Sequence, residues 1–222
     1  MAPLNHAPGT FCWAGLATSD VAAACAFYHG LFGWKASADG IFRHDGQEVA
    51  FLYRQTPPRW TSVVAVEDAD AAAARACELG GAAVARETVV LPGSGRAAAI
   101  RDPTGATVAL WQAAGRAGAA RLDRAGALCW NELMTGDLGR AKAFFSVLVG
   151  WEYERENAHE RVVGANASMR ERAGAPARWI PYFGVQRAGQ TVRRAEELGG
   201  RILAPALIAD PLGAAFAVVE RK

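Results

Sequence analysis

The sequence predicts an α+β protein built from two tandem copies of one domain, and two observations lead to that prediction. The stretches at 11–34 and 128–151 agree at 11 of 24 positions when they are laid at an offset of 117. In addition, the first copy reads as a strand, a helix and several short strands, and this order occurs twice within it. An internal duplication of this extent organises the whole chain.

The repeat continues to the end of both copies. PPRW at 57–60 matches PARW at 176–179, both copies contain ELGG, and DPTGA at 102–106 matches DPLGA at 210–214. The offset falls from 119 at ELGG to 108 at the DP turn, so the second copy lacks about 11 residues there. We therefore predict domains at 9–113 and 126–222, a small polar linker at 114–125, and a shortened strand hairpin near 201–209.

The elements of the first copy follow from periodicity and from capping residues. An apolar run at 11–17 leads to Asp20, a predicted N-cap, and then to a helix with one apolar face that closes at Gly33. A second helix is predicted at 68–79, and it stops at a Gly-Gly pair. The predicted strands of this copy are 11–17, 34–37, 40–44, 48–54, 61–66, 82–90, 96–101 and 107–112.

Composition and charge exclude several classes of protein. Apolar residues make up 51% of the chain, but no apolar run approaches the roughly 18 residues that span a bilayer. The net charge of +2 and the scattered arginines argue against a nucleic-acid partner. The amino terminus shows no secretion signal, and the four cysteines form no CxxC pair. We therefore expect a cytoplasmic protein whose thiols are reduced and mostly buried.

Several short motifs follow one another along the chain. They are an aspartate seven residues before Phe27 or Phe144, then LFGW or LVGW, V-x-D-x-D, ELGG and the final DP-x-GA. Together these motifs resemble the vicinal oxygen chelate superfamily, which includes glyoxalase I, bleomycin-resistance proteins and extradiol dioxygenases. The segments PPRWTSVVAVED, RDPTGATVALWQ and CWNEL are similar to the two-domain, glyoxalase-like "hydroxylase" branch. The resemblance implies that each domain pairs two βαβββ modules into a cupped mixed sheet, with helices on its convex side.

The resemblance also implies where a metal site would lie in each cup. Metal-dependent members place ligands on the first, fifth and last strands of a domain. Counting from the helix-opening aspartates and from the DP turns puts these ligand positions at Trp13, Thr61 and Ala109, and at Trp130, Ile180 and Ala217. Divalent metals in such sites prefer histidine nitrogen and carboxylate oxygen, so we predict no metal ligands and no cofactor.

The predicted cups carry aromatic and apolar side chains. Because side chains alternate along a strand, residues two positions from each ligand-equivalent position share its face. Such walls suit a flat organic molecule, although Trp13 and Trp130 would also fill the cups by packing alone. The predicted ligand-binding residues are Trp13, Thr61, Trp111, Trp130, Met134, Tyr182, His44 and His159. The other repeated tryptophans, at 34, 60, 151 and 179, are predicted to be core residues.

Glu132 is the predicted catalytic residue, because its counterpart in the first copy is Gly15. A carboxylate without a charged partner on an apolar wall has a raised pKa and can act as a general base or acid. The alternatives are that Glu132 binds a cationic group on a ligand, or that it forms an ion pair with an arginine. His44 and His159 lie on middle strands and are candidates for the edge of a cavity.

Three functions remain open from the sequence, and whether the chain is an enzyme is one of the open points. The first is a metal-independent superfamily member that binds an aromatic or polycyclic molecule and catalyses proton transfer, cyclisation or a hydroxylation-type step in antibiotic biosynthesis. The second is a non-enzymatic self-resistance protein that sequesters a drug. The third is a metal-dependent lyase or dioxygenase that uses His44, His159 or Glu132 as ligands. The expected partner is a small molecule, without nucleic acid or membrane, and the chain is expected to be a monomer or a homodimer.

Overall fold

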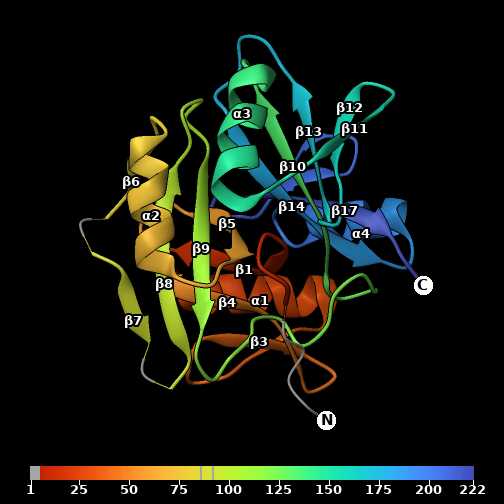
Figure 1. The fold of residues 1–222 in the computed structure, drawn as a ribbon. Coiled ribbons are helices and arrows are strands. Elements are labelled where there is room, and N and C mark those ends of the chain that lie inside the picture. The colour runs from red at the N-terminus through yellow and green to blue at the C-terminus, as the bar shows by residue number, and fades with distance from the viewer. Residues whose placement is uncertain (1–5, 86, 92) are drawn as a thin grey trace. The chain divides into compact units, whose positions relative to one another are not determined.

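The computed structural model describes residues 6–85, 87–91 and 93–222. The first repeat contains two helices, α1 (Val21–Phe32) and α2 (Ala69–Glu78). Its strands are β1 (Phe11–Thr18), β2 (Lys35–Ala36), β3 (Ile41–His44), β4 (Gln47–Arg54), β5 (Arg59–Ala65), β6 (Ala82–Ala83), β7 (Val89–Leu91), β8 (Gly95–Arg101) and β9 (Thr107–Ala113). Figure 1 shows the order of these elements.

The second repeat follows the same order and contains α3 (Leu138–Val149) and α4 (Ala188–Glu197). Its strands are β10 (Leu128–Thr135), β11 (Tyr153–Glu156), β12 (His159–Val162), β13 (Ala167–Glu171), β14 (Arg178–Val185), β15 (Arg201–Ala204), β16 (Leu207–Ala209) and β17 (Ala215–Glu220). The two repeats therefore have the predicted strand–helix–strands order twice each.

Strand pairing confirms the predicted modules and the predicted α+β class. In each module the first and last strands run parallel, as β1 with β4, β5 with β9, β10 with β13 and β14 with β17. One sheet has the order β2-β3-β4-β1-β5-β9-β8-β6, with β7 also paired to β8, and the other has the order β11-β12-β13-β10-β14-β17-β16-β15. Each mixed sheet is thus built from one repeat.

The first helix of each repeat is bounded by the residues that the sequence indicated. Asp20 and Asp137 cap α1 and α3, and the carboxylate of each accepts a backbone hydrogen bond from the residue three positions on. Gly33 and Gly150 close these helices with φ of 72°, in the left-handed region where a side chain would be strained.

The strands after α2 differ from the prediction. In place of the expected strand at 82–90 the structure has two short strands, β6 and β7. The second repeat keeps a hairpin in the corresponding place, where β15 pairs antiparallel with β16 across a turn at Ala206, whose φ is 62°. The residues missing from the second repeat correspond to the region of β7 and its turn.

Clustering of contacts divides the chain into two compact units, and each unit contains segments of both repeats. Unit 1 consists of 1–12, 62–118 and 131–179, and its core includes residues of α2 and α3. Unit 2 consists of 13–61, 119–130 and 180–222, and its core includes residues of α1 and α4. Each hydrophobic core therefore combines a module of the first repeat with a module of the second.

In each unit, a tryptophan of one repeat donates a hydrogen bond to a backbone carbonyl of the other repeat, and the two tryptophans occupy matched positions. In unit 2, Trp34 Nε1 donates a 2.9 Å hydrogen bond to the carbonyl of Gly126, just before β10. In unit 1, Trp151 Nε1 donates a 2.6 Å bond to the carbonyl of Gly9, just before β1. Both indoles are buried, as are those of Trp60 and Trp179, which confirms the predicted core role of all four tryptophans.

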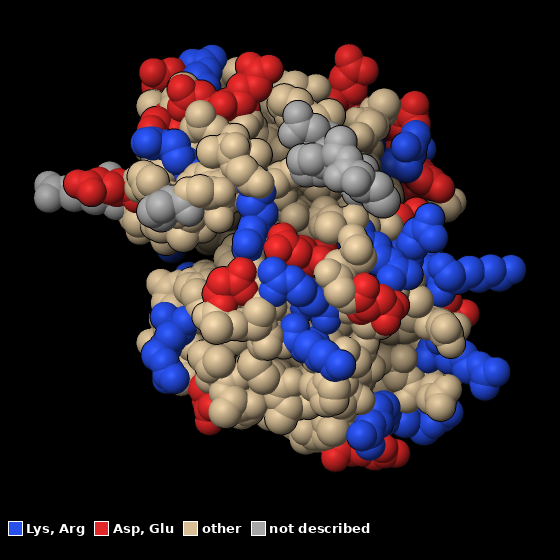
Figure 2. Space-filling view, turned by 90° about the horizontal axis from the view of Figure 1, so that it is seen from below, with Lys and Arg blue, Asp and Glu red and all other residues tan. Residues whose placement is uncertain are grey.

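No helix in the described part of the chain is long and apolar enough to cross a bilayer. On the face shown in Figure 2, basic and acidic side chains are interspersed rather than gathered into one basic stripe. This mixed pattern agrees with the small net charge of the chain.

Candidate functional site

Glu132 lies in the middle of β10 in unit 1, and its side chain is only 5% exposed. A charged group is seldom buried to this extent unless it is paired. The pairing comes from two neighbouring residues of the same unit. Nδ1 of His159 and Nε of Arg170 each lie 3.1 Å from Oε1 of Glu132.

The three side chains converge because of strand register. Met134 of β10 pairs with Arg170 of the parallel strand β13, so Glu132 and Arg170 project from adjacent rungs of one face. His159 begins β12, which pairs with β13 on its other side. The imidazole is 40% exposed and the guanidinium 37% exposed, so a ligand can reach both partners of a carboxylate that is itself almost inaccessible.

Met134 extends this cluster toward a second arginine. Its thioether sulfur contacts Nη2 of Arg170 at 3.7 Å and Nη1 of Arg172 at 3.6 Å. The methionine is 3% exposed, whereas Arg172 is exposed and directly follows β13. We call Glu132, Met134, His159, Arg170 and Arg172 the Glu132 cluster.

The corresponding face of the first repeat is aromatic, and it lies in unit 2. Gly15 of β1 pairs with Phe51 of β4, as Glu132 pairs with Ser168. A Cβ atom on Gly15 would lie 2.3 Å from the Phe51 ring, so the ring occupies the space that the Glu132 side chain takes in the other repeat. Phe51 also contacts Trp13 at 4.7 Å and stacks on Tyr53 at 6.0 Å between ring centroids.

The other predicted ligand-binding residues are not members of the Glu132 cluster. Thr61 is buried on β5 of unit 2, and Trp111 is buried on β9 of unit 1, where its Nε1 donates to the carbonyl of Arg116. Trp130 on β10 and Tyr182 on β14 are partly exposed and belong to unit 2. The sequence thus indicated three members of the Glu132 cluster, namely Glu132, Met134 and His159.

His44 lies outside that cluster. It ends β3 in unit 2, and a Cβ atom on Gly126 would lie 2.5 Å from its ring. Its Nδ1 is 3.6 Å from a carboxylate oxygen of Asp45, which in turn contacts Arg121. His44 therefore packs against the segment that joins the repeats.

Sequence reasoning missed Arg170 and Arg172, and also Phe51 and Tyr53. All four could have been found by pairing the last strand of a module with its first strand. In that pairing, alternate residues along β4 and β13 lie beside the inward-facing residues of β1 and β10. The repeat offset of 117 aligns Phe51 with Ser168 and Tyr53 with Arg170, so the exchange of aromatic for polar residues was visible in the sequence.

The cysteines differ in exposure more than the sequence suggested. Cys12 and Cys129 are buried, Cys25 is partly exposed and Cys77 is exposed. Burial raises the pKa of Cys12 to about 12 and that of Cys129 to about 11. These two thiols stay protonated at neutral pH, which makes them poor nucleophiles.

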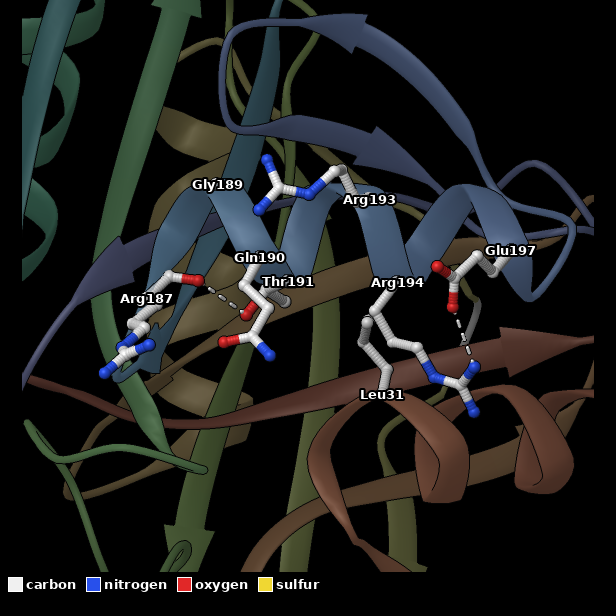
Figure 3. Close-up of a pocket in the computed structure, with 8 residues that line it drawn as sticks. All are labelled: Leu31, Arg187, Gly189, Gln190, Thr191, Arg193, Arg194 and Glu197. Carbon is white, nitrogen blue, oxygen red and sulfur yellow. Dashed lines mark hydrogen bonds and ion pairs between the residues drawn. The ribbon is translucent and has the colours of Figure 1, made fainter.

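A hollow of about 880 Å³ in unit 2 lies between α1 and α4, apart from every predicted site residue (Figure 3). Arg194 reaches from α4 toward Leu31 of α1, where its Nε donates to the carbonyl of Gly30 and its Nη1 to Glu197. Arg193 projects from another part of α4 and Arg187 from the N-cap position before it, so the arginines do not converge on one point.

Comparison with known proteins identifies the family. A sequence profile described as Glyoxalase/Bleomycin resistance protein/Dioxygenase superfamily matches residues 10–110. The putative glyoxylase CFP32 of Mycobacterium bovis (strain ATCC BAA-935 / AF2122/97) is 31% identical to this chain, and the alignment covers 97% of this chain and 96% of the relative. The anthracycline biosynthesis protein DauV of Streptomyces sp. (strain C5) is 32% identical to this chain, and the alignment covers 98% of this chain and 95% of the relative. The chain belongs to the glyoxalase/bleomycin resistance protein/dioxygenase superfamily.

Solved structures of this superfamily share the fold at low sequence identity. The Mn(II)-bound glyoxalase from Novosphingobium aromaticivorans aligns with a TM-score of 0.67 at 16% identity and covers 96% of this chain and 82% of its own. Homoprotocatechuate 2,3-dioxygenase from Arthrobacter globiformis aligns with a TM-score of 0.66 at 16% identity, with 99% and 82% covered. These similarities establish the fold and not the chemistry.

The superfamily includes metal-dependent enzymes, but the side chains at the six positions that the motif resemblance implies for metal ligands do not suit a metal. An indole N–H donates and does not ligate, and alanine and isoleucine have no donor atom. Thr61 alone among the six positions carries an oxygen, and a neutral hydroxyl is a weak ligand. Within the described ranges, no three or more His, Cys, Asp or Glu residues form a group that could hold a metal ion.

Proposed function

We propose that the chain acts in natural-product biosynthesis. It binds an aromatic or polycyclic small molecule at the Glu132 cluster and catalyses a proton transfer on that molecule. The observation that carries this proposal is the buried Glu132 carboxylate beside a half-exposed imidazole. Such a carboxylate orients the imidazole, which is exposed enough to exchange a proton with a bound ligand. The superfamily membership and the name of the 32% identical anthracycline biosynthesis protein support this class of ligand.

The proposed chemistry runs without a metal, because the superfamily's ligand positions hold side chains that do not bind one. In the proposed step His159 takes a proton from one position of the ligand and returns it to another, while the Glu132 carboxylate, which also contacts Arg170, holds the imidazole in place. Proton transfer of this kind supports isomerisation or cyclisation of a polycyclic ketone, and it can assist a hydroxylation carried out by another component.

The test replaces Glu132 by Gln and follows conversion of a panel of anthraquinone and anthracycline aglycones by mass spectrometry. We expect Glu132→Gln to lower turnover at least 100-fold and to leave binding nearly intact, because the amide keeps the shape but not the charge. Turnover equal to that of the wild type would remove Glu132 from the mechanism.

Glu160→Gln is the matched control. Glu160 is also buried and also paired, with Lys142 at 2.9 Å and Arg155 at 3.4 Å, but it alternates to the other face of β12. It should keep full turnover. Elemental analysis of the same preparations completes the test, since activity that requires stoichiometric zinc, iron, nickel or manganese would contradict the metal-free mechanism.

A second candidate function is ligand sequestration without chemistry, and the aromatic face of unit 2 favours it. Trp13, Phe51 and Tyr53 form a continuous aromatic row on β1 and β4, and Tyr53 is 36% exposed. Aromatic side chains of this kind bind flat ring systems by stacking. The measurement is quenching of tryptophan fluorescence by the ligand. Sequestration would be supported if Tyr53→Ala weakens the quenching, Glu132→Gln leaves it unchanged, and no product is formed.

A further inference from the structure

We infer that the ligand of the Glu132 cluster carries an acidic group, and that Arg172 together with Arg170 binds it. This inference rests on the proposed function and specifies the class of ligand, namely a carboxylate or an acidic phenol on an aromatic ring system. It is drawn from the charges on one face of β10, β12 and β13.

Cationic groups outnumber the carboxylate in the cluster. The cluster contains two guanidiniums and one carboxylate, that of Glu132, which is in contact with His159 and Arg170. The only side-chain partner that the structure shows for the guanidinium of Arg172 among the described residues is the Met134 sulfur at 3.6 Å. A thioether is a weak acceptor, so an exposed guanidinium held there retains nearly its full capacity to bind an anion.

The nearby acids do not neutralise this excess. Glu154 and Glu156 of β11 lie beside Arg161 and form their ion pairs with it. Glu160 alternates to the opposite face, where it pairs with Lys142 and Arg155. An anion brought by the ligand would therefore meet Arg172, for which the structure shows no carboxylate partner among the described residues, and beside it Nη2 of Arg170, whose Nε is the atom that contacts Glu132.

Geometry favours one oxyanion for the two arginines. Nη2 of Arg170 and Nη1 of Arg172 both contact the same sulfur atom, at 3.7 Å and 3.6 Å, so both guanidiniums lie on one side chain, that of Met134. Like charges held together repel, and a carboxylate that binds both of them relieves the repulsion while it gains charge-assisted hydrogen bonds.

The first repeat lacks these charges, which makes the anion site specific to the second. The residues at the same offset are Tyr53 for Arg170, Gln55 for Arg172 and Ala17 for Met134. An acidic ligand is thus directed to β13 of unit 1, and a neutral aromatic ligand has no such preference.

The test compares anthraquinone-2-carboxylate with its methyl ester, which keeps the ring and removes the charge. Binding to the full-length protein is measured by tryptophan fluorescence and by calorimetry at low and at high salt. We expect the acid to bind about tenfold more tightly than the ester, and Arg172→Gln to lower the affinity for the acid about tenfold without changing that for the ester. Arg172→Lys should retain part of the effect, because it keeps the charge and loses the planar fork.

Arg161→Gln is the matched control, since Arg161 lies on a neighbouring strand but is already paired with two carboxylates. It should leave both affinities within twofold of the wild type. Equal binding of acid and ester to the wild type would overturn the anion inference and leave the proposed function standing. Failure of both compounds to bind would overturn the aromatic ligand class, and the anion inference with it.

Discussion

At the scale of the residue, the two hydrophobic cores differ in a hydroxyl group at one matched position, where unit 2 has Tyr28 and unit 1 has Phe145. In unit 2, the Tyr28 hydroxyl accepts a 2.8 Å hydrogen bond from Trp60 Nε1 and donates a 3.0 Å bond to a carboxylate oxygen of Asp210. Burial raises the pKa of Tyr28 well above its ordinary value and also raises that of Asp210. The three groups form a fully satisfied polar network inside an apolar core.

Unit 1 has the same arrangement without the hydroxyl. Phe145 takes the place of Tyr28, and its ring meets Trp179 at 5.7 Å and 83°, against 5.4 Å and 85° for Tyr28 and Trp60. Trp179 Nε1 and Oδ2 of Asp102 are buried without a hydrogen-bond partner in the described residues. Burial raises the pKa of Asp102, which reflects the cost of holding this carboxylate charged.

We therefore predict that Phe145→Tyr stabilises the protein. The added hydroxyl would accept from Trp179 and donate to Asp102, and two new hydrogen bonds to buried, unsatisfied groups should raise the free energy of unfolding by about 1 to 2 kcal/mol. Urea unfolding at neutral pH measures the change. Tyr28→Phe is the reciprocal variant and should lower the free energy of unfolding by about 1 to 3 kcal/mol. Loss of stability in Phe145→Tyr would show that unit 1 has no space for the hydroxyl.

At the scale of the element, the first module of each repeat pairs a small residue on one parallel strand with a larger one on the other. Gly15 on β1 lies beneath Phe51 of β4, whereas Glu132 on β10 lies beside Ser168 of β13. The exchange keeps the volume on this face of the strand pair and changes its chemistry from aromatic to ionic. A strand pair can therefore keep its backbone while it changes what it binds.

This complementarity predicts that Gly15→Ala destabilises the protein through Phe51. The new Cβ atom would meet ring atoms at 2.3 to 3.0 Å, so the ring must move, at a cost of about 1 to 3 kcal/mol. Combining it with Phe51→Ala should remove most of that cost. A double-mutant cycle in urea measures the coupling free energy, and additive effects would show that the ring does not restrict position 15.

At the scale of the whole molecule, the repeats and the compact units do not coincide. Each unit takes one module from each repeat, and each core draws on a helix of the first repeat and a helix of the second. The bonds from Trp34 to Gly126 and from Trp151 to Gly9 join one repeat to the other in the same way. A single repeat therefore contains half of each core.

This interleaving predicts how the chain responds to a cut between the repeats. A protease site inserted after Ala117 should yield two fragments that remain associated after cleavage, because separating them would expose both apolar cores. Size-exclusion chromatography and native mass spectrometry follow the association. Each fragment expressed alone should unfold or self-associate. A monomeric, cooperatively folded single repeat would contradict the interleaved core.

The sequence by itself determined the duplication, the order of elements and the buried tryptophans. These features depend on local signals: the capping residues Asp20 and Asp137, the closing glycines Gly33 and Gly150, and an apolar periodicity that each segment carries alone. It also singled out Glu132, because an acid stands where the other repeat has glycine. The superfamily fold followed from these motifs taken together.

Only the tertiary structure decided what surrounds Glu132 and how the modules form cores. The sequence left open whether Glu132 pairs with an arginine, and the structure places it against both Arg170 and His159. Those partners are 38 and 27 positions away in the chain, and strand register, which long-range pairing sets, brings them together. The interleaved units arise for the same reason, because an apolar helix face packs against any complementary face and its own sequence does not specify which.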